Sequence, residues 1–230
     1  GRQQSRVRLF EAGLRFTPTA DGLEQVPMLA GIVSGDAFQA SWNNPKNSLD
    51  FFDVKGNIES LLTLCGVVGE FVATTQTVLH PGQAAEITVQ GAVIGCVGAL
   101  HPSVIEALGL SGPVYVFELQ QSALLQGRLP QFKPLSRFPA VSRDLALLVP
   151  DRVAAAEILA VVRQNAGEVL RDLSVFDVYR GRGVADQHYS LALSLTWQDT
   201  ERTLLDTEIQ AFVENILQSV SSTCGALLRS

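Results

Sequence analysis

Cysteine is scarce in this chain of 230 residues. The three that occur, Cys65, Cys96 and Cys224, are far apart and odd in number. Such spacing does not make a disulfide framework, and no CxxC pair is present to bind zinc. The cysteine content therefore argues against a disulfide-stapled domain and fits a protein of the reducing cytoplasm.

The sequence also lacks the short motifs that carry much enzyme chemistry. It contains no HExxH, no GxxxxGK phosphate loop and no GxSxG, and the glycines of GAVIGCVG (91–98) do not match GxGxxG. His80 and His101 each precede a proline, a pair that marks a turn more often than a ligand, and His188 falls in a predicted loop. We therefore predict no catalytic residue and no metal site.

Long apolar runs are missing as well. The longest, GAVIGCVGAL (91–100), is broken by glycines and falls short of the roughly 20 residues that cross a membrane. No signal-like region opens the chain, so no membrane association is predicted. The first residue is not Met, which suggests a segment cut from a longer protein.

Positive charge is in the minority. The 17 Lys and Arg face 23 Asp and Glu, and the acidic excess extends over both halves, with 8 basic against 11 acidic residues in 1–133 and 9 against 12 in 134–230. Residues 137–230 contain no lysine. A dedicated nucleic-acid binder is usually basic, so any RNA binding must come from a local site or from help by a partner. The charge fits one lobe of a larger enzyme.

Residues 6–126 read as a mixed α/β region. Asp50 precedes apolar residues at helical spacing and is a suitable N-cap, and Gly66 ends that helix. Gln90-Gly91 predicts a hairpin turn. Strands are expected at 7–16 (interrupted at Ala12-Gly13), 25–34 (buried on both faces), 70–75, 86–90, 92–100 and 114–119, and short helices at 103–108 and 122–126. Short connections favour a largely antiparallel sheet flanked by helices, an α+β fold.

The second half has a different pattern. Residues 127–137 contain two prolines and little periodicity, which predicts a linker between domains at 1–130 and 137–230. Strands at 145–149, 175–180, 189–198 and 226–229 alternate with helical patterns at 155–162 and 209–220, the latter opened by a capping-box-like Thr203 and Asp206. This β-α-β-β-α-β order is the ferredoxin-like arrangement, with both helices on one sheet face.

The most informative segment is the hairpin predicted between 175–180 and 189–198. Because side chains alternate along a strand, Leu191, Leu193, Leu195 and Trp197 share a core face. Their neighbours, which are small and polar, share the other: Ser190, Ala192, Ser194 and Thr196. If Phe176 and Val178 join the leucine face, then Asp177, Tyr179 and Ser190 lie together on the open one.

An aromatic ring, a carboxylate and a hydroxyl on an open sheet suit a nucleobase. The ring stacks, the polar groups read the base edge, and Arg180 and Arg182 at the rim meet phosphate. Two other interpretations remain open on the pattern alone. A surface Tyr on a strand is usually a cross-strand packing residue, and Arg-Gly-Arg-Gly can be only a flexible turn.

Several motifs carry a family resemblance. FDVYRGRGV (176–184), YSLALSL (189–195) and QDTERTL (198–204) closely resemble the C-terminal domain of bacterial phenylalanyl-tRNA synthetase β subunits. The resemblance continues upstream and covers nearly the whole chain in order: SRFPAVSRDLALLV (136–149), GALHP (98–102), LHPGQAA (79–85), DFFDVKGNIESLL (50–62) and FEAGLRF (10–16). It implies a class II synthetase-like module at 1–130 that is not catalytic, then a ferredoxin-fold anticodon-binding domain at 137–230.

The resemblance also implies a site. The family recognises the anticodon of tRNA(Phe), chiefly its first base, guanine. By motif, Tyr179 stacks on that base, Asp177 accepts hydrogen bonds from its donors, and Ser190 adds a polar contact. Further candidates, for phosphate contacts, are Arg180, Arg182 and Arg202.

Partners and cofactors follow from the same resemblance. It implies an α subunit that supplies the active site, an (αβ)2 assembly in the cytoplasm, and ATP and Mg²⁺ used by the whole enzyme, with no cofactor bound by this chain. Class II enzymes grip ATP with a strand arginine, for which Arg15 is the nearest candidate, and with a second glycine-flanked arginine, which is missing here. The chain alone is therefore expected to be inactive in aminoacylation.

Two alternatives from other classes stay open, because fold alone does not define function. A ferredoxin-like domain can be a regulatory module that binds a small molecule at a domain edge. It can also be a purely structural interaction domain. Base reading differs from both in requiring Tyr179 to be exposed on the open face.

Overall fold

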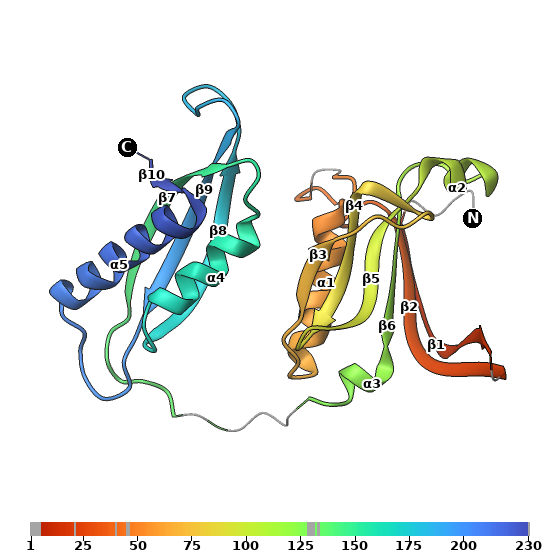
Figure 1. Ribbon diagram of the computed structural model, residues 1–230, viewed down its shortest axis with the longest axis horizontal. Helices are drawn as coiled ribbons and strands as arrows, with labels where there is room; N and C mark the ends of the chain where they lie inside the picture. Colours follow the sequence, from red (N-terminus) through yellow and green to blue (C-terminus); the bar gives the residue numbers. More distant parts are fainter. Residues whose placement is uncertain are drawn as a thin grey trace. The chain divides into compact units, whose positions relative to one another are not determined.

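The computed structural model describes residues 6–20, 22–39, 41–44, 47–127, 132 and 134–229. The chain divides into two compact units, Gly1–Gln131 and Phe132–Ser230 (Figure 1), and each is treated below by itself. Within the described ranges, no helix is both long and apolar enough to span a membrane.

The first unit is built on one six-stranded sheet. Its strands are β1 (Arg6–Thr19), β2 (Gly22–Gly35), β3 (Glu70–Ala73), β4 (Leu79–Val89), β5 (Ala92–Leu100) and β6 (Val114–Gln120). Their order across the sheet is β1-β2-β6-β5-β4-β3, and all neighbours are antiparallel. The helices are α1 (Phe51–Leu64), α2 (Pro102–Ala107) and α3 (Gln121–Leu124). The predicted antiparallel α+β architecture is confirmed.

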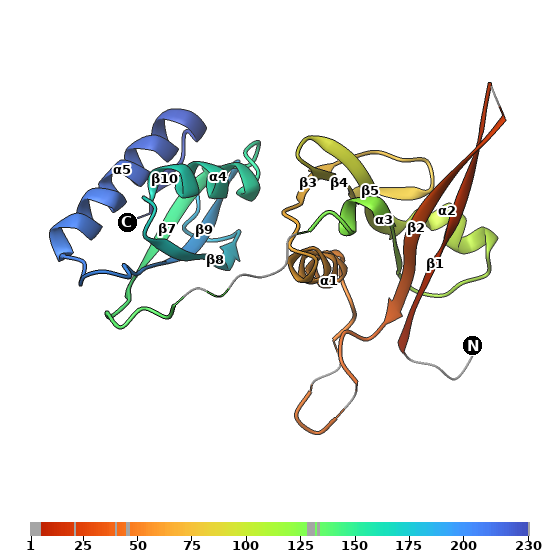
Figure 2. The same cartoon turned by 90° about the horizontal axis from the view of Figure 1, so that it is seen from below.

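Helix α1 covers this sheet and shows how the sequence directs the packing (Figure 2). Asp50 accepts a hydrogen bond from the Asp53 N–H at 3.0 Å, and Asp53 accepts one from the Asp50 N–H at 2.9 Å, so a capping box begins the helix. Val54, Ile58 and Leu62 recur every four residues on one side of α1 and are buried against the sheet. The predicted N-cap is confirmed.

Strands β1 and β2 depart from the sequence-based expectation. β1 is continuous through Ala12-Gly13 rather than interrupted there. β2 pairs with β6 only over Met28–Ser34, while its outer part pairs with β1 alone, so only Met28 and Val33 of β2 are buried. The expectation that this strand is buried on both faces was wrong, because burial requires elements packed on those faces, and of β2 only Val33 joins the core cluster of described residues that includes α1.

The second unit is a four-stranded sheet with two helices. In chain order its elements are β7 (Val141–Pro150), α4 (Ala155–Asn165), β8 (Leu170–Tyr179), β9 (His188–Trp197), α5 (Asp206–Cys224) and β10 (Leu227–Leu228). The sheet order is β10-β7-β9-β8, again antiparallel throughout. The predicted β-α-β-β-α-β order is confirmed, and α4 and α5 lie on one side of the sheet (Figure 2).

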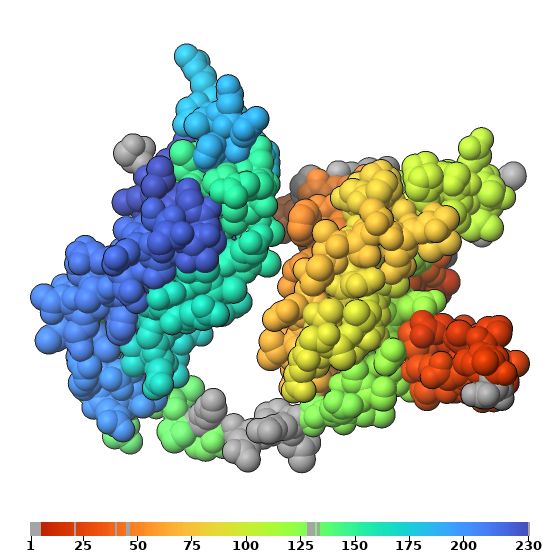
Figure 3. Space-filling model, in the orientation of Figure 1, coloured from red at the N-terminus to blue at the C-terminus, as the bar shows by residue number. Residues whose placement is uncertain are grey.

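The core of this unit lies between the helices and the leucine face of the sheet. The alternate residues predicted for that face are fully buried: Leu191, Leu193, Leu195 and Trp197 on β9. Apolar residues of α4 and α5, among them Ile158, Ile209 and Ile216, pack onto them. Side chains of both helices cover this face in the space-filling view, and the β8–β9 loop projects from one end of the unit (Figure 3).

Both ends of α5 have defined caps. The predicted capping box of Thr203 and Asp206 does not form. The N-cap residue is Leu205 instead, and the Glu208 carboxylate accepts a hydrogen bond from the Leu205 N–H at 2.9 Å. Gly225 ends the helix with a φ of 68°, a left-handed conformation that favours glycine. The chain then turns back so that β10 can pair with β7.

Candidate nucleic-acid interface

The face of the second sheet that points away from the helices has a floor of small and polar side chains. Cross-strand pairing between β7 and β9 puts Ser142 opposite Thr196 and Asp144 opposite Ser194, and their side chains are joined by hydrogen bonds of 2.9 and 2.7 Å. Next along the strands come Ala146 opposite Ala192 and Leu148 opposite Ser190. Apart from Leu148, these side chains are small or polar, which leaves room for a flat group to approach the sheet.

A β-bulge in β8 decides which residues join this face. Val175 lies opposite Leu193 and Val178 opposite Leu191, so both share the leucine face although they are three residues apart. Phe176 is the extra residue between them and has no residue opposite it in the register. The Phe176 side chain is 58% exposed instead of joining the core as the alternation predicted.

Beyond the bulge, the three predicted base-contacting residues share the open face. Tyr179 lies directly opposite Ser190, and Asp177 lies one pair along, opposite Ala192. The Asp177 carboxylate is exposed and accepts no hydrogen bond from any group in the described part of the chain. It is thus available as an acceptor for a ligand.

Tyr179 closes one end of this face. Its side chain is 39% exposed, and its hydroxyl donates to the Arg182 carbonyl oxygen at 3.3 Å. Gly181 has a φ of 155°, and an added Cβ there would lie 2.8 Å from the tyrosine hydroxyl. The glycine therefore lets the hairpin loop fold back against the edge of the ring.

Ser190 is covered, unlike the exposed hydroxyl that the sequence suggested. Its side chain is only 4% exposed, and its Oγ accepts a hydrogen bond of 3.0 Å from Arg229 Nη1. The Arg229 guanidinium also lies over the Tyr179 ring, 5.6 Å from the centroid. Sequence reasoning missed Arg229, although strand alternation after Gly225 could have placed it on the open face.

The predicted phosphate contacts lie in three different surroundings. Arg182 is exposed in the β8–β9 loop and forms no ion pair with a described residue. Arg180 pairs with Asp151, and its guanidinium lies 4.8 Å from the centroid of Tyr189. Since Tyr189 belongs to the core cluster, Arg180 is on the helix-covered side of the sheet.

Arg202 lies at the far end of the sheet. Both of its terminal nitrogens donate to the Glu208 carboxylate at 2.7 Å. Those two hydrogen bonds, with a third from the Leu205 N–H, lower the pKa of Glu208 from 4.5 to about 2. Ser190 and Trp197 are seven residues apart on β9, a rise of about 23 Å, and Arg202 comes after Trp197. The structure does not bring Arg202 to the base-contacting residues.

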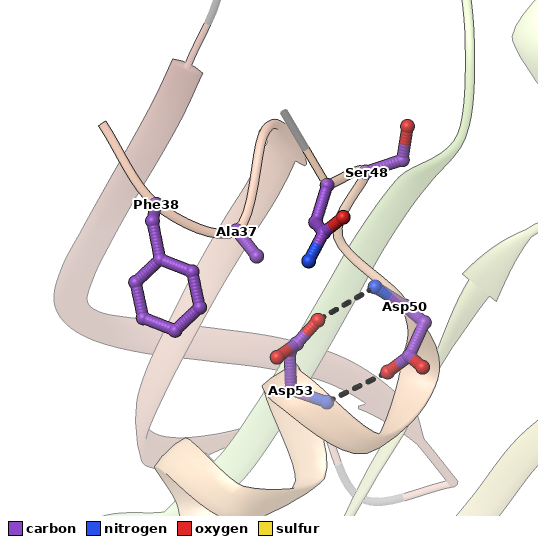
Figure 4. Close-up of a pocket in the computed structure, with 6 residues that line it drawn as sticks. Ala37, Phe38, Ser48, Asp50 and Asp53 are labelled. Carbon is purple, nitrogen blue, oxygen red and sulfur yellow. Dashed lines mark hydrogen bonds between the residues drawn. The ribbon is translucent and has the colours of Figure 1, made fainter. Parts of the chain in front are cut away.

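Among its described residues, the first unit offers no comparable cluster. Arg15 forms an ion pair with Glu118 at 3.6 Å. A hollow lined in part by Phe38, Asp50 and Asp53 opens near the start of α1 (Figure 4), but both carboxylates accept hydrogen bonds within the capping box. Among the described residues, no three His, Cys, Asp or Glu side chains gather closely enough to hold a metal ion.

Comparison with known proteins assigns each half of the chain to a family model. Residues 1–121 match the model described as phenylalanyl tRNA synthetase beta chain CLM domain, and residues 136–229 match the ferredoxin-fold anticodon binding domain. The resemblance expected from the motifs is thereby confirmed, as is the ferredoxin-like fold of the second half.

Three similar proteins carry the same name. The chain is 50% identical over 230 residues to the phenylalanine–tRNA ligase beta subunit of Pseudomonas fluorescens. It is 46% identical over 233 aligned residues to that of Vibrio cholerae, and 42% identical over 229 to that of Hahella chejuensis. These alignments cover 99–100% of the chain and 29% of each relative, so the chain spans less than a third of their length. The chain belongs to the phenylalanyl-tRNA synthetase β-chain family.

Proposed function

We propose that this chain is the tRNA-recognition and assembly portion of a phenylalanine–tRNA ligase, and that its second unit binds the anticodon of tRNA(Phe). The observation that carries the proposal is the cross-strand register. It brings an exposed carboxylate, Asp177, and a partly exposed ring, Tyr179, to one open sheet face beside Ser190.

The chemistry of these groups favours guanine. A carboxylate is an acceptor only, and guanine offers donors at N1 and N2 that a carboxylate can pair with. Tyr179 supplies a stacking surface, and single-stranded bases are commonly recognised by stacking and by hydrogen bonds to their edges. Ser190, which Arg229 covers, lies opposite Tyr179 and belongs to the polar floor of the site. We therefore propose the first anticodon base as the group that is read.

Stacking and base reading contribute more here than phosphate attraction. The formal net charge is −6, and two of the predicted phosphate-contacting arginines have carboxylate partners: Arg180 pairs with Asp151 and Arg202 with Glu208. Arg182 remains the phosphate candidate nearest to the site. A single base–aromatic stack contributes about 1–3 kcal/mol.

We propose that catalysis belongs to a partner. In this proposal an α subunit carries out the ATP- and Mg²⁺-dependent aminoacylation in the cytoplasm, and residues 1–130 form a non-catalytic class II-like module that joins an (αβ)2 assembly. The ion pair of Arg15 with Glu118 supports a structural role for this arginine instead of a grip on ATP.

A regulatory or structural module is the other candidate function. Two features favour a ligand on the open face: the exposure of the Tyr179 ring, and the Asp177 carboxylate, which has no hydrogen-bond partner among the described residues. A regulator that binds at a domain edge does not require them. A structural module predicts that both residues can be changed without loss of tRNA charging in the reconstituted enzyme.

The test is a titration of an anticodon stem-loop. A dye-labelled tRNA(Phe) stem-loop is titrated with the chain at low salt, beside a loop whose first anticodon base is adenine, and fluorescence anisotropy is followed. Weaker binding of the adenine loop supports base reading on this sheet. Equal binding of both loops, or no binding even with the α subunit added, contradicts the proposal and leaves the unit as a scaffold.

A further inference from the structure

The loop between β2 and α1 presents a tryptophan to solvent. Trp42 is 97% exposed, and its indole N–H donates to no described residue. The other tryptophan of the chain, Trp197, is fully buried and donates to the Ala166 carbonyl oxygen at 2.8 Å. Tryptophan is among the residues most enriched at the energetic centres of protein interfaces. Its full exposure therefore points to a surface that another protein segment covers.

The loop that carries this tryptophan projects from the sheet (Figure 2) and is closed by hydrogen bonds. At its base the Ala37 N–H donates to the Asn47 carbonyl oxygen at 2.9 Å, and Ala37 is buried in the core of the first unit. Near its tip the Asn44 N–H donates to the Ser41 carbonyl oxygen and to Ser41 Oγ, both at 3.2 Å. A side chain on a loop closed in this way is positioned before a partner binds, which lowers the entropic cost of binding.

Two more aromatic rings are exposed at the two ends of this loop. Phe38 is 60% exposed near its start, and Phe52 is 72% exposed in the first turn of α1. Phe38 also lines, with Asp50 and Asp53, the hollow of about 410 Å³ at the base of the loop (Figure 4). The rings offer apolar contact area, and the hollow offers a recess for a side chain. We call Phe38, Trp42 and Phe52 the Trp42 surface.

The chain enters the first unit beside this loop. Arg6, the first residue of β1, lies opposite Gly35, the last residue of β2, and the loop follows directly. Arg8 Nη2 donates to the Ala37 carbonyl oxygen at 3.2 Å, so β1 contacts the base of the loop. Trp42 comes seven residues after Gly35 and lies at most about 25 Å from it. Chain that precedes residue 1 is therefore within reach of the Trp42 surface.

We propose that the part of the β subunit ahead of residue 1 packs on the Trp42 surface. This chain covers 29% of each relative, and its second unit resembles the C-terminal domain of their family, so the remaining length precedes it. A segment tethered beside the loop has a high effective concentration there, which favours it over the α subunit as the occupant. It presents aliphatic groups to the ring and an oxygen acceptor to the indole N–H, because buried indoles usually donate. The inference is independent of base reading by the second unit.

The test is photo-crosslinking in the complete enzyme, with α and β subunits purified together. Trp42 is replaced by p-benzoylphenylalanine, an aromatic residue that crosslinks on irradiation, and the crosslinked peptides are mapped by mass spectrometry. Asn57, which is exposed on α1, is replaced in the same way as the control. Position 42 should crosslink to residues of the β subunit that precede residue 1, and with a higher yield than position 57.

Iodide quenching examines the same contact without a foreign residue. The difference in emission between the wild type and Trp42→Phe isolates the fluorescence of Trp42. Iodide should quench this difference in the 230-residue chain, where the indole is exposed, and most of the quenching should be lost in the complete enzyme.

Three results would overturn the proposal. Crosslinks from position 42 to the α subunit would make that subunit the occupant. A crosslink yield at position 42 no higher than at position 57 would mean that no segment covers the loop. Equal quenching of Trp42 in the 230-residue chain and in the complete enzyme would mean that the indole stays in solvent.

Discussion

Replacing Tyr179 by alanine should weaken binding of the guanine-containing stem-loop, because it removes the ring on which we propose the base stacks. A base–aromatic stack contributes about 1–3 kcal/mol. The ring is 39% exposed, and the Arg229 guanidinium lies over it at 5.6 Å. A base on that side would give up part of a cation–π contact of about 0.5–1 kcal/mol. We therefore expect a net loss of about 1–2 kcal/mol, or about 5- to 30-fold in Kd.

Tyr179→Phe separates the ring from its hydroxyl. It removes the hydrogen bond to the Arg182 carbonyl, which is 3.3 Å long and solvent-exposed, so its contribution to stability is about 1 kcal/mol at most. The stacking surface stays in place. The Kd should remain within about threefold of the wild-type value.

Val178→Ala is the matched control. Val178 is the neighbour of Tyr179 on the same strand, but it lies opposite Leu191 on the leucine face, so its loss perturbs β8 without touching the open face. Binding is measured by anisotropy of the labelled stem-loop. Folding is measured by denaturant unfolding with the fluorescence of Trp197, which is fully buried, while the 97% exposed Trp42 reports little. Equal losses for Tyr179→Ala and Val178→Ala, or for Tyr179→Ala and Tyr179→Phe, would refute the stacking assignment.

Two further predictions concern the stability of the second unit. The pKa of Glu208 falls from 4.5 in the unfolded chain to about 2 in the fold, so its stabilising contribution is present above pH 4.5 and is lost as the pH falls toward 2. Glu208→Gln should therefore lower the free energy of unfolding at neutral pH. A difference in unfolding free energy between variant and wild type that stays constant from pH 4.5 to 2 would contradict the assignment. Gly167 has a φ of 78°, and an added Cβ would lie 2.6 Å from Phe212. Gly167→Ala should lower the free energy of unfolding by about 1–3 kcal/mol in the same denaturation assay, and an unchanged midpoint would mean that Phe212 moves freely.

The faces of the hairpin could be read from the sequence only in part. Alternation correctly placed Asp177, Tyr179 and Ser190 on one face, because beyond the bulge the strand follows the regular period of two. Phe176 was misplaced, since the bulge adds a residue to one strand of the pair and the sequence gives no signal for the extra position. The exposed Phe176 is the consequence.

Local sequence determined the caps and turns most reliably. Asp50 begins α1, Gly225 ends α5, and Gln90-Gly91 forms the turn between β4 and β5, where both residues have positive φ. Each of these depends on groups within a few residues along the chain. The burial of β2 was misjudged, because it depends on what packs on the two faces of the strand, and that is not a local property.

By itself, the sequence determined the family, the two antiparallel α+β folds and the residues that share the open face, because these follow from motifs, periodicity and local caps. Only the tertiary structure decided what surrounds those residues. It covers Ser190 with Arg229, pairs Arg180 with Asp151, and leaves Arg202 at the far end of the sheet. The physical reason is strand order. Arg229 comes 39 residues after Ser190 in the chain, and β10 forms the edge of the sheet opposite β8, so the partners of a side chain depend on strand order and not on sequence distance.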